Sequence, residues 1–485
     1  MAQLFAHYLN TFFYLAYINR RTRLNTEIWL SAPATTTETD KGIYVRNHGT
    51  QMSFPIQLTA TTRRQALGRF NSPPGAEVPE KILQEYFIDE CKALSRSTKL
   101  VVEDSHSIPL LATRKPDFAF IQKGSPLNAL DVVAVGEIRK CAGNKFSNAD
   151  IGHAVSFGEK VLQIQPRRTY VYVVLTDCKV ICIFKVKKHD SNTHDNIRFS
   201  YEYTPPYKLT YEIKGTPPPG WRHLVTVMEC SPDQLGWIEP SLNFGSDTVT
   251  LVRPISTGRT SIVYEGKLND GISVVVKIAK SDKYWSCFEK EKAVLEALSS
   301  LNSSHLQTLL LDNEGTLVTT PLCTKVNNLR KEDIGNIINT LKTLHSEFKL
   351  VHMDLRKYNF LRSDKGDILI IDWGYSATID ETGPFAGALE CMPNDILASL
   401  ADGGQITYSG RIDLICLAKA FYLMLHKPPN VERISFGASH NISSRAQNIL
   451  AFWESNAESE LWNKIFQDAE GLRYDSLIQE LEKLF

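Results

Sequence analysis

Apolar and polar positions in the first half of the chain follow patterns that predict helices and strands in turn. The segments PEKILQEYFIDECKALSR (79–96) and ADIGHAVSFGEKVLQIQ (149–165) have apolar residues at the three- and four-residue spacing of amphipathic helices. Between them lie two runs of strand type, KPDFAFIQ (115–122) and LDVVAVGEI (130–138), and a strand pair, TYVYVVLTD and KVICIFKV, follows at 169–186. This order of elements predicts an α/β domain.

The second half of the chain changes from strand patterns to helical ones. ISTGRTSIVYEG (255–266) is typical of a hairpin-like turn, and ISVVVKI (272–278) has the β-branched content of a strand. The later segments IGNIINTLKTLHSEFKL (334–350) and GRIDLICLAKAFYLML (410–425) have helical periodicity. We therefore expect an α+β domain with a β-rich first lobe and a helical second lobe.

Proline- and glycine-rich segments mark the boundaries between these parts. They are strongest at NSPPGAEVP (71–79) and at EYTPPYKLTYEIKGTPPPGW (202–221). We predict four parts, namely a small amino-terminal region of no assigned type, an α/β domain, a connector and the two-lobed domain. Their expected ranges are 1–73, 77–204, 205–247 and 248–485.

Composition narrows the class of protein. The 485 residues contain 54 basic and 54 acidic side chains, and this zero net charge argues against a globally basic nucleic-acid binder. Nine cysteines have no paired spacing, which indicates a reducing compartment, either cytoplasmic or nuclear. The apolar run within residues 1–21 lacks a basic start and is too short to span a membrane. We expect it to be a packed element, so secretion into a host has no clear signal and no membrane partner is expected.

The stretch VHMDLRKYNFLRSDKGDILIIDWG (351–374) contains the strongest chemical signal. Asp354 and Asn359 fall in one loop after a helical segment, and Asp372 follows the short apolar strand DILIID. Hard oxygen ligands of this kind suit Mg²⁺, and the remaining aspartate can orient a hydroxyl nucleophile. The combination H-x-D-x-x-x-x-N with I-D-W-G is therefore much more specific than a lone D-x-G.

Residues upstream supply the other groups that such a site requires. Lys277 ends the apolar run ISVVVKI, where a buried lysine can neutralise nucleotide phosphates if a carboxylate holds it. Glu291, in the helical stretch CFEKEKAVLEAL, is placed to be that carboxylate. Small residues at Ser256, Gly258 and Ser261 in the preceding turn allow backbone amides to approach phosphates closely.

These ordered motifs resemble the protein-kinase fold over residues 248–425. The resemblance implies that ATP and Mg²⁺ are the cofactors and that Lys277, held by Glu291, contacts the α- and β-phosphates. It also implies that residues of the nucleotide loop and hinge contact ATP, namely Ser256, Gly258, Ser261, Val263, Pro321 and Cys323.

The resemblance assigns the reaction to the catalytic loop and the D-W-G motif. Asp354 would be the catalytic base, and Arg356 would occupy the position of a lysine near the transferred phosphate. Asn359 and Asp372 would hold Mg²⁺. We expect Asp413, at the start of the segment 410–425, to tie the catalytic-loop backbone to a helix.

Two substrate classes are open at this point. HMDLRKYNF followed by IIDWG also resembles the aminoglycoside and choline phosphotransferases, whereas GALECMPNDIL (387–397) resembles the end of a protein-kinase activation segment. The second feature favours a serine/threonine-type protein kinase with a protein substrate. Met353 replaces an arginine that in many kinases binds a phosphorylated activation loop, so we predict activity without phosphorylation at Thr378 or Thr382.

The α/β domain contains a second, weaker motif. Asp117 begins one predicted strand and Glu137 ends the next, so the two carboxylates can share a Mg²⁺ ion. The pattern resembles the PD-(D/E)-x-K restriction-endonuclease-like fold. That family has a lysine two residues after the glutamate, but this chain has Arg139 there and Lys140 next to it. Arginine cannot act as a general base, which leaves both a DNA-cutting domain and a degenerate binding domain open.

The order of the two domains adds a further resemblance. A nuclease-like domain followed by a divergent kinase resembles Crinkler-type effectors and related fungal-type kinases over residues 77–485. DNA is then a possible partner through the first domain. The alternative to a protein kinase is a DNA-acting effector nuclease in which the kinase-like domain is regulatory.

Overall fold

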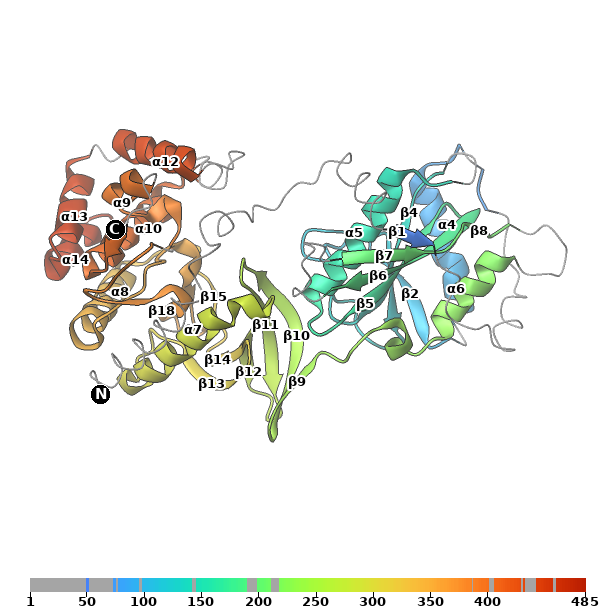
Figure 1. Cartoon of the computed structure of the whole chain (residues 1–485), viewed down its shortest axis with the longest axis horizontal. Coiled ribbons are helices and arrows are strands. Elements are labelled where there is room, and N and C mark those ends of the chain that lie inside the picture. The colour runs from blue at the N-terminus through green and yellow to red at the C-terminus, as the bar shows by residue number, and fades with distance from the viewer. Residues whose placement is uncertain are drawn as a thin grey trace. The chain divides into compact units, whose positions relative to one another are not determined.

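A computed structural model describes most of the chain from residue 73 onward (Figure 1). The described residues are 49–51, 73–75, 77–95, 98–141, 145–189, 199–210, 218–385, 387–400, 405–428, 431, 442–456 and 459–485. The expected amino-terminal region therefore lies almost wholly outside them. Within the described residues the chain divides into two compact units, one up to residue 257 together with 262–270, and one with 258–261 and 271–485.

The amino-terminal unit contains an eight-stranded sheet with the strand order β1-β7-β6-β5-β4-β3-β2, in which β8 pairs with β6. Its strands are β1 (Gly49–Gln51), β2 (Leu100–Asp104), β3 (Phe118–Gln122), β4 (Val132–Ile138), β5 (Tyr170–Thr176), β6 (Val180–Lys188), β7 (Phe199–Tyr203) and β8 (Tyr207–Lys208). The β4–β5 and β1–β7 pairs are parallel and the other pairs are antiparallel. The parallel β4–β5 pair is connected by a helix, as a parallel connection requires.

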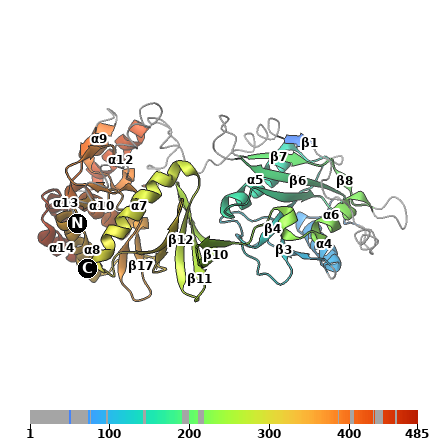
Figure 2. The same cartoon turned by 60° about the horizontal axis from the view of Figure 1, so that its bottom comes forward.

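Helices cover both faces of this sheet (Figure 2). The helices are α4 (Glu80–Leu94), α5 (Asn148–Ile164) and α6 (Pro219–Glu229). α4 and α6 share one apolar core with Phe118 and Tyr172, whereas α5 packs on the opposite face, where Gly158 lies against Val173 and Val186. Because both faces are covered, the central strand β4 is wholly buried, and Glu137 is its one charged residue.

The predicted elements of this unit are confirmed within a few residues of their ends. Both helices and all four strands predicted between residues 79 and 186 are present. The Ser147 side chain and Asp150 form a reciprocal capping box that begins α5. Gly136 is required in β4, because a Cβ atom there would lie 2.0 Å from the Phe118 ring. The close packing of Gly136 against the Phe118 ring thus fixes the backbone of β4 next to Glu137.

A six-stranded sheet has the order β13-β14-β12-β11-β10-β9. Its strands are β9 (Ser241–Phe244), β10 (Asp247–Thr257), β11 (Ser261–Leu268), β12 (Ser273–Ala279), β13 (Thr308–Asn313) and β14 (Thr316–Thr320). The predicted hairpin is β10 and β11, which pair antiparallel. The helix α7 (Trp285–Leu298) follows β12 and contributes Glu291 to a buried position.

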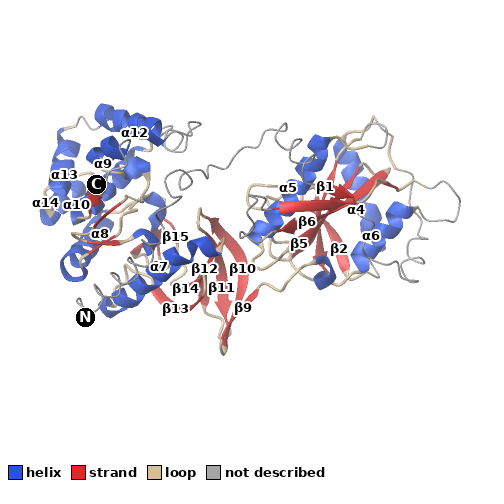
Figure 3. Ribbon diagram, in the orientation of Figure 1, coloured by secondary structure: helices blue, strands red, loops and turns tan. Residues whose placement is uncertain are grey.

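The chain that follows β14 is mainly helical (Figure 3). Its helices are α8 (Lys331–Thr343), α9 (Asn394–Ser399), α10 (Gly410–His426), α12 (Ile442–Asn456), α13 (Glu460–Glu470) and α14 (Tyr474–Glu482). Short strands connect them: β15 (Thr324–Lys325), β16 (Leu350–Val351), β17 (Phe360–Arg362), β18 (Ile368–Ile370), β19 (Ala377–Thr378), β20 (Thr382–Gly383) and β21 (Ile406–Thr407). One apolar core links α7, α8 and α10 to α12, α13 and α14. Among the described helices, none is long and apolar enough to cross a membrane.

Candidate active site

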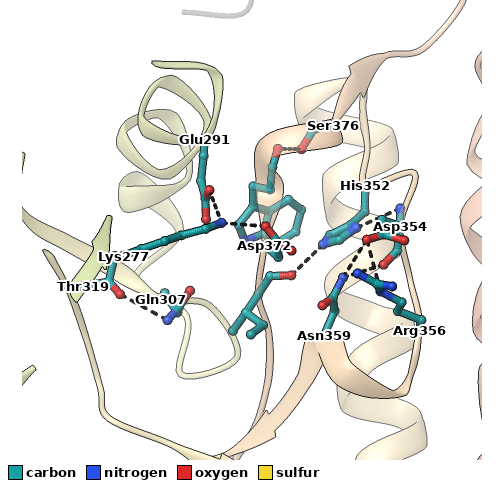
Figure 4. Close-up of polar contacts among 12 residues, drawn as sticks. Lys277, Glu291, Gln307, Thr319, His352, Asp354, Arg356, Asn359, Asp372 and Ser376 are labelled. Carbon is teal, nitrogen blue, oxygen red and sulfur yellow. Dashed lines mark hydrogen bonds and ion pairs between the residues drawn. The ribbon is translucent and has the colours of Figure 1, made fainter. Parts of the chain in front are cut away.

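The centre of the site is one lysine shared by two carboxylates (Figure 4). Nζ of Lys277, near the end of β12, lies 2.6 Å from Oε2 of Glu291 and 2.6 Å from Oδ1 of Asp372. The predicted Lys277–Glu291 pair is therefore present, and Asp372 joins it directly. Burial alone would lower the pKa of Lys277, but the two carboxylates outweigh it and raise that pKa well above its usual range.

The local backbone directs Asp372 into this pair. Asp372 follows β18 and adopts a left-handed conformation with φ of 72°, which turns the chain into a short 3₁₀ helix at Trp373–Tyr375. Burial would raise the pKa of Asp372, but the nearby Lys277 ammonium lowers it below its usual range. Asp372 is thus held as a carboxylate, which is the form that can bind a metal ion.

Asp354 is the carboxylate of the catalytic loop, and it is buried. Its Oδ1 accepts a hydrogen bond from the Ala388 amide at 3.0 Å, and its Oδ2 lies 3.3 Å from Nε of Arg356 and accepts from Nδ2 of Asn359 at 3.2 Å. Burial raises the pKa of Asp354 to about 7, although Arg356 opposes this shift. A carboxylate whose pKa lies close to neutrality is well suited to accept a proton.

His352 and Asp413 fix the backbone around Asp354. The Asp413 carboxylate accepts hydrogen bonds from the amides of His352 at 2.6 Å and Met353 at 2.9 Å, which confirms the predicted structural role of Asp413. His352 Nε2 lies 2.9 Å from the Ile371 carbonyl, and its Nδ1 accepts from the Asp354 amide at 3.2 Å. Burial lowers the pKa of His352, so the neutral ring is favoured and its Nε2–H is the donor to Ile371. His352 therefore connects the two catalytic segments and does not contact a reacting group.

The donor set fits a hard metal ion bound to phosphate. Lys277 balances only one of its two carboxylate partners, so the Lys277–Glu291–Asp372 group has an excess of one negative charge. Asn359 Nδ2 donates to the Asp354 carbonyl at 2.8 Å as well as to the Asp354 side chain, so its Oδ1 is the atom suited to a metal. Carboxylate and amide oxygens are the ligands that Mg²⁺ prefers. Asn359 and Asp372 are thus the residues that would hold it.

The predicted nucleotide loop and hinge occupy the expected elements. Ser256 and Val263 face each other as partners in the β10–β11 hairpin. At its tip the Gly258 amide donates to the Ser261 carbonyl at 2.9 Å. Nζ of Lys280 donates to the Gly258 carbonyl at 2.5 Å, a contact that the sequence does not predict.

The hinge residues Pro321 and Cys323 lie between β14 and β15. The Cys323 thiol is directed to the Pro321 carbonyl at 3.5 Å. Burial raises the pKa of Cys323 to about 11, so its thiol stays protonated at neutral pH. Contact of these two residues with adenine stays a prediction.

The segment after Asp372 is attached to the body of this unit at both ends. β19 pairs with β16 next to the catalytic loop, and β20 pairs with β21. Further along, the buried Lys419 donates to the Met392 carbonyl at 2.5 Å and to Oδ1 of Asn394 at 2.7 Å. The segment is thus ordered by backbone pairing and by one buried lysine.

The amino-terminal unit brings its predicted residues together as well. Glu137 is buried, and its Oε1 lies 2.6 Å from Nη2 of Arg139 and 3.2 Å from Nε2 of His153 on α5. Nη1 of Arg139 reaches Glu80 on α4 at 3.2 Å. Asp117 precedes β3, and its Oδ2 accepts from the Ile138 amide at 2.8 Å.

The electrostatics of this second cluster differ from those of the first. Burial, and next the Glu137 charge, raise the pKa of Asp117 to about 7. Oε2 of Glu137 is buried, and no hydrogen-bond partner for it exists among the described residues. Lys140 follows β4 and is exposed, as expected. No group of three or more His, Cys, Asp or Glu side chains that could hold a metal ion occurs in the described part of the chain.

Several contacts were not predicted from the sequence. They involve Glu80, His153, His345, Lys280, the Ala388 amide and Tyr474, which approach the two sites from distant segments. The motif patterns contain no signal for them.

The comparisons with known proteins agree with the carboxy-terminal architecture. Residues 80–168 match the family model of a domain of unknown function (DUF6826), and residues 249–483 match that of the protein kinase domain. A search of curated proteins found no match. Among solved structures, the chain is similar to one titled "Structure of vaccinia related kinase 3", with 15% identity and a TM-score of 0.39, over 51% of this chain and 91% of that chain. The family match, with the β-rich and helical lobes, identifies a protein-kinase-like fold and supports a kinase activity.

Proposed function

We propose that this protein transfers the γ-phosphoryl group of ATP to a serine or threonine hydroxyl of a protein substrate. The observation that carries the proposal is the position of Lys277, 2.6 Å from both Glu291 and Asp372. A lysine held in this way is preorganised to bind phosphate oxygens, and the neighbouring oxygens are suited to Mg²⁺. When bound, Mg²⁺ neutralises charge on the phosphates.

The residues of the catalytic loop assist the transfer of the phosphoryl group. The substrate hydroxyl oxygen forms a bond to the γ-phosphorus, the bond to the β–γ bridging oxygen breaks, ADP leaves, and the hydroxyl proton passes to Asp354. Asn359 and the Ala388 amide hold Asp354 in place. Arg356, beside Asp354, offsets charge on the transferred group.

The ordered segment after Asp372 favours a protein substrate over a small molecule. Its Ala388 amide binds the proposed base directly, and Lys419 fixes the residues that follow. A segment anchored in this way beside the base is suited to position a polypeptide. The aminoglycoside- or choline-type alternative would place the labelled phosphate on a small molecule instead.

A phosphotransfer assay with γ-labelled ATP and Mg²⁺ tests this proposal. We expect label on serine and threonine of a mixed protein substrate, and a loss of about 10²–10⁴-fold for Asp354→Asn. Asp364→Asn, at an exposed position in the turn between β17 and β18, is the matched control and should retain full activity. Label on tyrosine would contradict the serine/threonine assignment, and label on neither class of protein residue would contradict a protein kinase.

We also propose that the amino-terminal cluster binds a divalent cation next to phosphodiester without cutting it. Asp117 and Glu137 lie near enough for one charge to raise the pKa of the other, and the buried Oε2 of Glu137 suits a cation. Arg139 can bind phosphate but cannot activate a water molecule. This arrangement supports the further proposal of a Crinkler-type effector that acts in the cytoplasm or nucleus.

Thermal melting with Mn²⁺ tests this second site. We expect Mn²⁺ to raise the melting temperature of the full chain and of the Glu85→Gln control by more than that of Glu137→Gln, which keeps only the site at Asn359 and Asp372. Incubation with supercoiled plasmid should give no cleavage. Cleavage that Asp117→Ala abolishes would instead establish a nuclease, with the kinase-like domain in a regulatory role.

A further inference from the structure

A chain of polar contacts connects the last helix of the protein to the catalytic loop. The hydroxyl of Tyr474 lies 2.7 Å from Nδ1 of His345, and Nε2 of His345 lies 3.1 Å from Oδ2 of Asp413. Asp413 in turn accepts from the amides of His352 and Met353, which immediately precede Asp354. Tyr474 and His345 are 129 residues apart in the sequence.

The direction of the hydrogen bonds follows from the chemistry of the groups. A carboxylate only accepts, so His345 presents Nε2–H to Asp413. Nδ1 of His345 then pairs with the Tyr474 hydroxyl, a group that can donate or accept a hydrogen bond. Asp413 is fully buried and His345 is 5% exposed, so both depend on these partners.

Neighbouring residues hold both Tyr474 and His345 in place. Tyr474 is the first residue of α14, which is tied to α8 by an ion pair of 2.9 Å between Lys342 and Asp475. Gly410 also packs closely against this ring, because a Cβ atom there would lie 2.5 Å from Nδ1 of His345. The His345 ring thus has little freedom to change its orientation unless Tyr474 is removed.

We propose that Tyr474 is a positioning residue for the catalytic loop, which acts through His345 and Asp413 on the backbone that holds Asp354. The proposal rests on the proposed kinase function only for its kinetic part. Its structural part, that α14 stabilises the amides of His352 and Met353, is independent of which reaction the site performs.

Tyr474→Phe tests the proposal by removing one oxygen while keeping the ring. The matched control is Tyr422→Phe, because the Tyr422 hydroxyl also makes one hydrogen bond, of 3.1 Å to the Asn456 carbonyl, away from the catalytic loop. We expect kcat to fall about three- to tenfold for Tyr474→Phe with the KM for ATP unchanged. Hydrogen exchange of the peptide that contains residues 351–355 should become several-fold faster only in Tyr474→Phe.

A double-mutant cycle separates this pathway from a general loss of stability. If the effect passes through His345, Tyr474→Phe should cause no further loss of kcat in a His345→Gln background. Unchanged exchange at residues 351–355, or effects that multiply in the double variant, would overturn the proposal. If the wild type transfers no phosphate, the proposed function fails, and the exchange measurement alone still decides whether Tyr474 stabilises the loop.

Discussion

The two candidate sites each place one cation between two carboxylates, yet they are built differently. Lys277 contacts Glu291 and Asp372 at equal distances of 2.6 Å, and its side chain is 16% exposed. Arg139 contacts Glu137 at 2.6 Å and Glu80 at 3.2 Å, and its side chain is 34% exposed. A lysine ammonium is a compact charge that can exchange one partner for a phosphate, whereas a guanidinium holds its partners in a fixed plane.

The two sites also differ in the groups near Lys277 and Arg139 that could take part in a reaction. The Lys277 site also includes a separate carboxylate, Asp354, whose pKa of about 7 allows it to take a proton. Near Arg139 a third carboxylate, Asp117, also has a pKa of about 7, but Arg139 occupies the position of the expected lysine and cannot act on water, and Lys140 is exposed. Similar charge clusters thus differ in chemistry according to which of their groups is able to exchange a proton or a ligand.

Removal of each cation gives the largest predicted contrast. Lys277→Met should lower the rate of phosphotransfer at least about 100-fold, because the Glu291 and Asp372 carboxylates then repel the ATP phosphates that the lysine would bind. Arg139→Met should leave that rate within about twofold of the wild type. Initial rates with labelled ATP measure both. Equal losses in the two variants would show that the two sites are coupled.

The pH dependence of phosphotransfer sharpens the role of Asp354. Because its pKa is about 7 in the folded protein, the base is mostly protonated below that pH. We expect kcat/KM to rise about tenfold per pH unit up to pH 7 and then to level. Rates between pH 5.5 and 9 measure this, and a profile that is flat from pH 5 upward would exclude Asp354 as the titrating base.

The raised pKa of Asp117 should make the free energy of unfolding depend on pH. Its pKa is raised from 3.8 to about 7, so the folded protein binds more protons than the unfolded chain between these values. Stability should therefore fall as the pH rises through this window, and the loss is complete above pH 7. Asp117→Asn should raise the unfolding free energy at pH 8 by about 1–3 kcal/mol and have little effect at pH 4.

Calorimetry of the full chain at both pH values measures the effect of Asp117→Asn. Asp89→Asn is a suitable control, because Asp89 is exposed on α4. A destabilised Asp117→Asn protein at pH 8 would show that the hydrogen bond from the Ile138 amide outweighs the repulsion by Glu137.

The sequence predicts the kinase-like site well because its motifs are local. Asp354 and Asn359 are five residues apart in one loop, and the pairing of Lys277 with Glu291 follows from one strand and the next helix. The contact between Tyr474 and His345 depends on how α14 packs against α8, and no short pattern encodes it. The same holds for Arg139, whose identity is plain from the sequence but whose second partner, Glu80, comes from a helix 59 residues earlier.

The smallest predicted effect concerns the segment that follows Asp372. Thr382→Ala should leave phosphotransfer within about twofold of the wild type. Thr382 is exposed in β20, and the segment is already held by the β20–β21 pair and by the hydrogen bonds of Asp380 and Glu381 with Tyr408. Met353 offers no guanidinium beside the base to which a phosphate could bind.

Initial rates of Thr382→Ala and Thr378→Ala, before and after phosphatase treatment, measure this independence. Each variant lacks one of the two candidate hydroxyls. Because activity is predicted not to depend on phosphorylation of either threonine, phosphatase should change neither the variants nor the wild type. A wild type that loses activity with phosphatase while Thr382→Ala starts inactive would mean that a phosphate at Thr382 orders the segment further. Backbone pairing would then be insufficient to order the segment after Asp372. The kinase-like site would be regulated by phosphorylation, whereas the Arg139 cluster already has its guanidinium in place.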